Sequence, residues 1–94
     1  MIYNLSYYLS DPECEKQLLD IIKSCPDFIQ YGGSCYLIDS GKGDLRRMVA
    51  DAKLDYSRLG ATDYVFLTGV TRESSFGVLS RPVIDWYSQH LASA

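Results

Sequence analysis

Apolar and polar residues alternate along the first stretch of the chain. The alternation assigns two sets of side chains to opposite faces: Tyr3, Leu5, Tyr7 and Leu9 to an apolar face, and Ile2, Asn4, Ser6 and Tyr8 to a mixed one. A period of two residues is that of a β-strand. Residues 2–9 are therefore predicted to form a strand that buries one face and leaves the other partly polar.

The spacing then changes to that of a helix. Ser10 and Asp11 can each accept a hydrogen bond from exposed backbone N–H groups, Pro12 suits the first helical turn, and Pro26 ends the helix. The apolar positions recur every three to four residues and make one stripe: Cys14, Leu18, Ile21, Ile22 and Cys25.

Two short apolar runs follow, at residues 28–31 and 34–38, and Gly32-Gly33 separates them. A glycine pair can adopt the positive φ of a tight turn, so these runs are predicted to form an antiparallel hairpin. Residues 40–43 then form a turn. A second amphipathic helix is predicted from Leu45 to about Lys53.

The last third of the chain is predicted to form a strand, a loop and a helix. Residues 64–70 are rich in β-branched and aromatic side chains and predict a strand. Residues 71–79 predict a polar loop, with or without a short edge strand. Ser80 is the expected N-cap of a terminal helix with Pro82 in its first turn. Its expected buried stripe, with Trp86 beside it, is Val83, Ile84, Tyr87 and Leu91.

The order strand, helix, strand, strand, helix, strand, helix predicts one α+β domain over residues 1–94, a ferredoxin-like βαββαβ sandwich with a C-terminal helix. The two central helices would cover one face of the sheet. A sheet with aromatic residues on both faces seldom leaves either face exposed to water. The second face therefore needs a partner, and we expect a homodimer. The expected interface consists of Asn4, Ser6, Tyr8, Tyr36, Phe66 and Trp86.

Composition narrows the class of protein further. The chain has 94 residues, of which 47% are hydrophobic and 22% charged, and this length and composition are typical of a single folded domain. A net charge of −3 argues against a protein that coats duplex nucleic acid. Three cysteines without a CxxC pair support neither a disulfide framework nor a zinc ribbon, and we expect them to be small buried apolar residues. No apolar run suits a membrane span or a signal peptide, so a cytoplasmic location without a membrane partner is expected.

Short segments along the chain are similar to one family. Leu5-Ser6-Tyr7-Tyr8-Leu9 resembles the hydrophobic-Ser-Tyr-Asp-Leu strand that opens the CRISPR-associated protein two family and its SinR-like relatives. Segments 19–24, 33–38, 44–47 and 67–69 resemble later parts of the same family. The resemblance implies a dimeric ferredoxin-like fold, and it implies that such a dimer can bridge other proteins as an adaptor.

The resemblance also bears on catalysis. In nucleases of that family the aspartate that ends the first strand pairs across the dimer to hold a divalent cation, and this chain has Tyr8 there. A neutral phenol is a poor ligand for magnesium. Asp11 is the weak candidate for a substitute, but we prefer it as a helix N-cap. We therefore expect no catalytic residue, no metal ligand and no cofactor, with magnesium required only if the chain is a nuclease.

The aromatic residues on the strands allow a second interpretation, in which they stack unpaired bases. The residues concerned are Tyr3, Tyr7, Tyr36, Tyr64 and Phe66. Because the lysines and arginines cluster elsewhere, we expect these rings in a core or a dimer interface. His90 has no cysteine or aspartate at a spacing that makes a pair, and we expect it to favour the negative end of the last helix.

These features favour a non-catalytic, homodimeric protein-interaction module, an adaptor or an inhibitor. It would present the 71–79 segment and the terminal helix to another protein. Two alternatives stay open. One is a metal-dependent nuclease or nucleic-acid-binding protein of the same family, and the other is an acidic inhibitor of an enzyme that acts on nucleic acid.

Overall fold

The computed structural model describes residues 1–52, 58–72 and 77–91. Its elements are β1 (Ile2–Tyr8), α1 (Pro12–Lys23), β2 (Asp27–Gly32), β3 (Cys35–Asp39), α2 (Leu45–Asp51), β4 (Tyr64–Val70) and α3 (Arg81–Leu91). Each strand and helix that the sequence predicts is present. The expected end of the second helix at Lys53 and the middle of the 71–79 segment lie outside the described residues.

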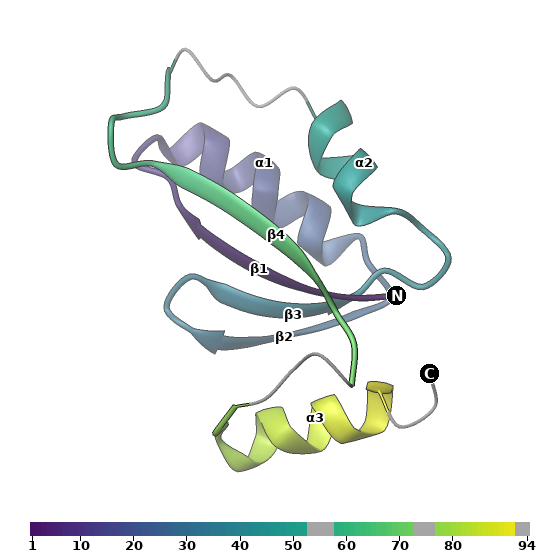
Figure 1. Cartoon of the computed structure of the whole chain (residues 1–94). Coiled ribbons are helices and arrows are strands. Elements are labelled where there is room, and N and C mark those ends of the chain that lie inside the picture. The colour runs from purple at the N-terminus through teal and green to yellow at the C-terminus, as the bar shows by residue number, and fades with distance from the viewer. Residues whose placement is uncertain (53–57, 73–76, 92–94) are drawn as a thin grey trace.

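The four strands form one sheet in the order β2-β3-β1-β4, and every neighbouring pair is antiparallel. β1 and β3 are the inner strands, while β2 and β4 are the edges. Helices α1 and α2 lie on one face of this sheet, and α3 lies on the other (Figure 1). The molecule is thus a small α+β protein of three layers.

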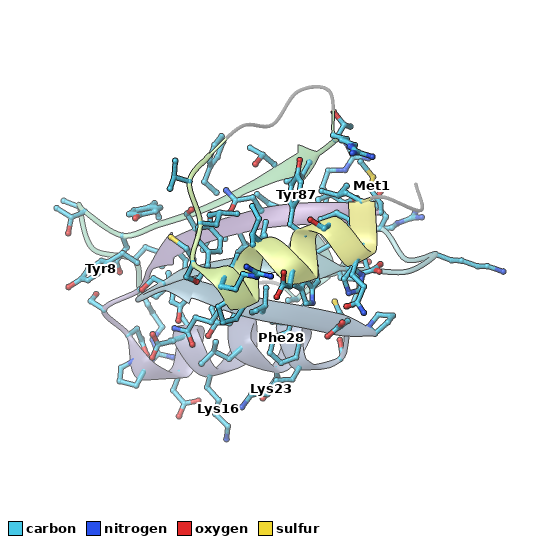
Figure 2. All side chains as sticks on the ribbon, turned by 90° about the horizontal axis from the view of Figure 1, so that it is seen from below. Met1, Tyr8, Lys16, Lys23, Phe28 and Tyr87 are labelled. Atoms are coloured by element: carbon cyan, nitrogen blue, oxygen red, sulfur yellow. The ribbon has the colours of Figure 1, made fainter. Side chains whose placement is uncertain are left out.

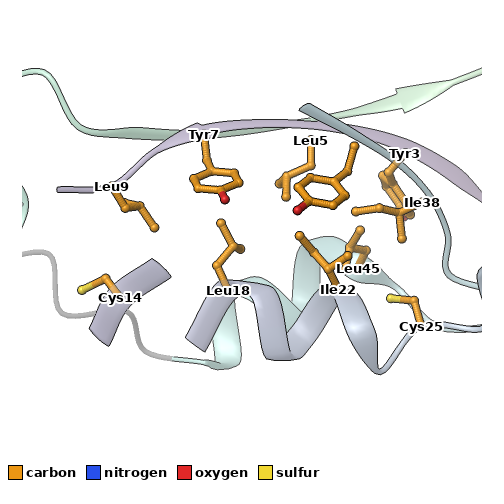
Figure 3. Packing of buried hydrophobic residues seen from close by; sticks show 11 residues of the cluster. Tyr3, Leu5, Tyr7, Leu9, Cys14, Leu18, Ile22, Cys25, Ile38 and Leu45 are labelled. Atoms are coloured by element: carbon orange, nitrogen blue, oxygen red, sulfur yellow. The ribbon is translucent and has the colours of Figure 1, made fainter. Parts of the chain in front are cut away.

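The larger core fills the space between the sheet and the first two helices (Figure 3). Tyr3, Leu5 and Tyr7 of β1 point into it, as the alternation predicts, and Leu18 and Ile22 of α1 meet them. Leu5 and Leu18 are completely buried. Burial of these side chains fixes the register of β1, because a slip by one residue would turn the whole set toward α3.

A second, smaller core lies between the sheet and α3. Ile2 of β1 and Leu37 of β3 pack there against Val83, Trp86 and Leu91 of the helix. The sequence argument for a homodimer assumed that this face lies bare, and α3 of the same chain removes that premise for the part beneath it. Trp86 is also in the buried row of α3 rather than beside it, while Ile84 and Tyr87 are only half-buried.

The turns follow the sequence in part. Asp11 is the N-cap of α1, as preferred, and its side chain accepts from the Glu13 N–H at 2.9 Å. The β2–β3 hairpin forms, but neither glycine of its turn has a positive φ, and a bulge between Gln30 and Gly32 adjusts the register instead. The glycine that needs the left-handed region is Gly41, with φ of 63°.

The cysteines are free thiols, and two of the three are buried as expected. Burial, together with the nearby Asp39, raises the pKa of Cys25. Cys35 is the exception, because it is only half-buried and its Sγ lies 3.7 Å from the Ser6 Oγ. None of the helices in the described part of the chain is long and apolar enough to cross a membrane.

Candidate functional site

Three aromatic side chains are exposed at one end of the sheet, on the face that carries α3. Tyr8 of β1 lies directly opposite Tyr64 of β4, and Phe66 lies opposite Ser6. The exposed fractions of Tyr8, Tyr64 and Phe66 are 51%, 50% and 63%. Figure 2 looks onto α3 and shows Tyr8 at the end of the sheet that the helix does not reach. We call these three residues the aromatic cluster.

The cluster follows from the chain's alternation. Tyr8 continues the mixed face of β1, and Tyr64 and Phe66 occupy the same face of β4 because they are two residues apart. α3 covers the Ile2 end of this face and leaves the Tyr8 end open. Single exposed apolar residues are common, whereas neighbouring rings on two paired strands make a patch typical of a binding surface.

Carboxylates border the aromatic cluster. The Asp63 carboxylate, next to Tyr64 in the chain, accepts hydrogen bonds from the Ser10 N–H and hydroxyl group and from the Gly60 N–H. The Gly60 N–H, followed by the Ser10 groups, holds the pKa of Asp63 below its usual value. Asp11 pairs with Arg58 at 2.6 Å. Among the described residues next to the cluster in the chain, the charged groups are thus the Asp63 carboxylate and the Asp11–Arg58 ion pair.

The structure divides the six predicted interface residues into three pairs. Tyr8 and Phe66 are exposed in the cluster, and Asn4 and Ser6 are half-buried on the same face. Tyr36 and Trp86 are buried inside the chain at 8% exposure each. Tyr36 faces the other side of the sheet, where its ring stacks on Tyr7, and Trp86 fastens α3. These two side chains leave little surface for a partner.

Tyr64 belongs with the exposed residues, although the predicted interface omits it. The period-two pattern that places Phe66 on this face places Tyr64 there too, so the signal was present in the sequence. In the base-stacking interpretation, by contrast, Tyr3, Tyr7 and Tyr36 are core residues. Only Tyr64 and Phe66 of that set are accessible to a base.

A cavity of about 350 Å³ lies between α3 and the sheet. Its lining is mostly apolar and consists of Asn4, Tyr31, Leu37, Val70, Gly77, Leu79, Ile84 and Tyr87. The Tyr31 hydroxyl group donates to Asn4 Oδ1 at its polar side. The volume is at the low end of the range for small-molecule sites. It shows that α3 does not pack flush on the sheet along its whole length.

His90 fastens the C-terminal end of α3 to the sheet, which the sequence reasoning missed. Its Nδ1 lies 2.8 Å from Asp39 Oδ2, and its Nε2 lies 2.8 Å from Asp27 Oδ2. Each ring nitrogen thus lies within hydrogen-bond distance of a carboxylate, so the imidazole bridges strands β2 and β3. The two aspartates are 51 and 63 residues away in the chain, a separation at which no local motif can reveal the pairing.

Trp86 and the N-terminus complete this cluster. The Trp86 Nε1–H donates to Asp27 Oδ2 at 3.1 Å, and its ring stacks on His90 with centroids 3.9 Å apart. Burial alone would raise the pKa of Asp39. The Gly41 N–H, His90 and the N-terminal ammonium group outweigh burial and hold that pKa below its usual value. The contacts are those of a structural latch between α3 and strands β2 and β3.

No described group of three or more histidine, cysteine, aspartate or glutamate residues is arranged to hold a metal ion. The Asp11 carboxylate, the weak candidate ligand, is engaged by the Glu13 N–H and by Arg58. A metal at Asp11 would have to compete with both contacts.

We compared the chain with protein-family models, with curated proteins and with solved structures, and none of them matches. The similarity to the CRISPR-associated protein two family therefore rests on the short segments of the sequence, and membership stays a prediction.

Proposed function

We propose that this chain is a non-catalytic protein-interaction module, an adaptor or an inhibitor, that acts as a homodimer. The observation that carries the proposal is the aromatic cluster of Tyr8, Tyr64 and Phe66, each of them half or more exposed. Tyrosine and phenylalanine are enriched in protein interfaces, where their rings are buried against a partner.

We also propose that the fold is ferredoxin-like. The element order βαββαβ, the strand order β2-β3-β1-β4 and the two helices on one face support this proposal. α3 is then an addition that covers part of the second face. In this arrangement the sheet offers its remaining open area, at the Tyr8 end, to another chain.

Sedimentation velocity tests the proposal. At tens of micromolar the unmodified chain is expected to sediment as a dimer, and Phe66→Ser combined with Tyr64→Ser is expected to sediment as a monomer. Phe66→Tyr is the matched control, because it keeps an aromatic ring in the cluster and should keep the dimer. Circular dichroism checks that each variant is folded. An unmodified chain that stays monomeric would overturn the homodimer.

Binding of single-stranded nucleic acid is a second candidate, because exposed rings on a sheet are also platforms for unpaired bases. The carboxylate of Asp63, next to Tyr64 in the chain, disfavours it. Anisotropy of a labelled oligonucleotide distinguishes the two functions. A nucleic-acid-binding protein would bind with a steep dependence on salt and would lose binding in Phe66→Ser, whereas an interaction module would not bind at all.

A further inference from the structure

The two edges of the sheet differ in how they are protected. β2 carries Asp27, contains a bulge at Gln30 and is tied to α3 through Asp27. β4 has no charged residue and no proline, and its seven residues pair with β1 without a break in register. Natural proteins usually block an edge strand by one of these devices, because an open edge pairs with other chains. The edge of β4 lacks all of them.

The backbone hydrogen bonds show which groups of β4 face outward. The Tyr7 N–H donates to Ser34 and the Met1 carbonyl group accepts from Ser40, so the odd residues of β1 bond toward β3. The even residues of β1 must therefore bond toward β4, where their partners are also even. It follows that the backbone groups of Val65, Leu67 and Gly69 point away from the sheet, and within the described residues no partner meets them.

We infer that a second copy of this chain pairs antiparallel with the β4 edge, with Leu67 on the two-fold axis. This inference rests on the proposed homodimer and names the surface that would form it. A two-fold axis at Leu67 brings all three outward-facing residues into register: Leu67 bonds to Leu67 of the partner subunit, and Val65 bonds to the partner's Gly69. The pairing is self-complementary, as a symmetric dimer requires.

Side chains and charges support the same register. On the α3 face, Tyr64 would lie beside the partner's Val70 and Phe66 beside the partner's Thr68, and such aromatic and β-branched pairs stabilise a sheet. Asp63 precedes β4 and Arg72 follows it. Antiparallel pairing places the Arg72 end of each chain near the Asp63 end of its partner. The two β4 strands contain no charged residue. No like charges therefore meet along the paired strands, although each chain carries a net charge of −3.

The resulting dimer has one continuous sheet, in which Phe66 of each chain brings the two aromatic clusters toward each other across the seam. Tyr8, on the inner strand β1, stays one strand away from the seam. An extended surface with rings from both copies would thus remain on the α3 side. This is the surface that another protein would contact if the module is an adaptor.

Amide hydrogen exchange of the unmodified chain tests the pairing residue by residue. The N–H groups of Phe66 and Thr68 bond to β1 in either state, so their exchange should change little with protein concentration. The N–H groups of Val65, Leu67 and Gly69 should exchange at least about tenfold more slowly at dimeric than at monomeric concentration. Equal behaviour of the two sets in a dimer would overturn the inference.

Disulfide trapping tests the register. In a background with Cys35→Ser, a chain with Phe66→Cys is mixed with a chain with Thr68→Cys. The two positions would form a non-hydrogen-bonded pair with Cα atoms about 4.5 Å apart, a distance that a disulfide spans. A covalent dimer is expected from the mixture and not from either variant alone, since identical positions would lie more than about 7 Å apart.

The results separate the two proposals. A dimer in sedimentation without alternate amide protection and without the mixed disulfide would overturn the β4 pairing and leave the homodimer standing. A monomer at every concentration would overturn both. Alternate protection together with the mixed disulfide supports both.

Discussion

At the scale of single residues, the least predictable feature is the latch of His90, Trp86, Asp27 and Asp39. No spacing in the sequence relates these residues, because the latch exists only after α3 has folded back onto the sheet. Its two hydrogen bonds of 2.8 Å join a ring to two carboxylates, and hydrogen bonds of this charge-assisted kind are stronger than neutral ones. The latch therefore explains why α3 stays on its own sheet despite the cavity beneath it.

Replacing His90 tests the latch. His90→Ala removes both hydrogen bonds and the stacking on Trp86, and leaves two carboxylates without the ring that joins them. We expect the free energy of unfolding to fall by about 1–3 kcal/mol. Gln89→Ala, on the exposed side of the same turn, is the control and should have little effect. Urea unfolding followed by fluorescence of the single tryptophan measures both, and equal midpoints for the two variants would contradict the account.

The carboxyl group of Asp39 makes the stability of the fold depend on pH in the acid range. Its folded-state pKa lies below the ordinary value, so it contributes stability above the unfolded pKa and loses it as the pH falls through the folded one. Unfolding midpoints measured from about pH 5 to about pH 2 should therefore decrease. In Asp39→Asn the decrease should be smaller. An unchanged acid profile in that variant would show that Asp39 contributes nothing to it.

The hydroxyl group of Tyr7 makes stability depend on pH in the opposite direction, so that stability is lost as the pH rises. Burial, followed by the charge of Glu15, which accepts from the Tyr7 hydroxyl group at 3.2 Å, raises the pKa of Tyr7 to about 12. The unfolded chain loses this proton near pH 10, so stability should fall between about pH 10 and 12. Tyr7→Phe should flatten that part of the profile in thermal unfolding. A profile as steep as that of the unmodified chain would contradict the assignment.

At the scale of elements, the periodic pattern of apolar residues was sufficient to find all seven helices and strands of the described chain. The alternation of Tyr3, Leu5 and Tyr7 identified the buried face of β1 correctly. What it could not identify was the neighbour of each face. The period of two residues places Asn4 on the face opposite to that of Leu5. It cannot show that Ile84 and Tyr87 of α3 lie near Asn4, because that is a tertiary contact. Trp86 was misplaced for the same reason.

The start of α1 offers a test at this scale. Asp11→Ala removes both the cap to the Glu13 N–H and the pair with Arg58, and should reduce stability by about 1 kcal/mol. Asp11→Asn keeps the capping oxygen and should cost much less, since an ion pair to a half-exposed arginine contributes little. Chemical unfolding of both variants measures the difference. An asparagine variant as unstable as the alanine variant would assign the effect to Arg58.

At the scale of the whole molecule, the aromatic cluster could be predicted only in part. Tyr8 and Phe66 were on the expected face, and Tyr64 follows from the same alternation. Their exposure depends on the length of α3 and on where it lies along the sheet, and neither is encoded in a local pattern. The homodimer was first expected because a whole face seemed bare. It now rests on the smaller open end and on the unprotected edge of β4.

The mass of the chain in solution tests the central claim most directly. Sedimentation equilibrium of the unmodified chain at tens of micromolar is predicted to give an apparent mass of twice the 10.6 kDa of one chain. On dilution the mass should fall toward that of the monomer. An apparent mass of 10.6 kDa at every concentration would contradict the homodimer and, with it, the pairing of the β4 edges.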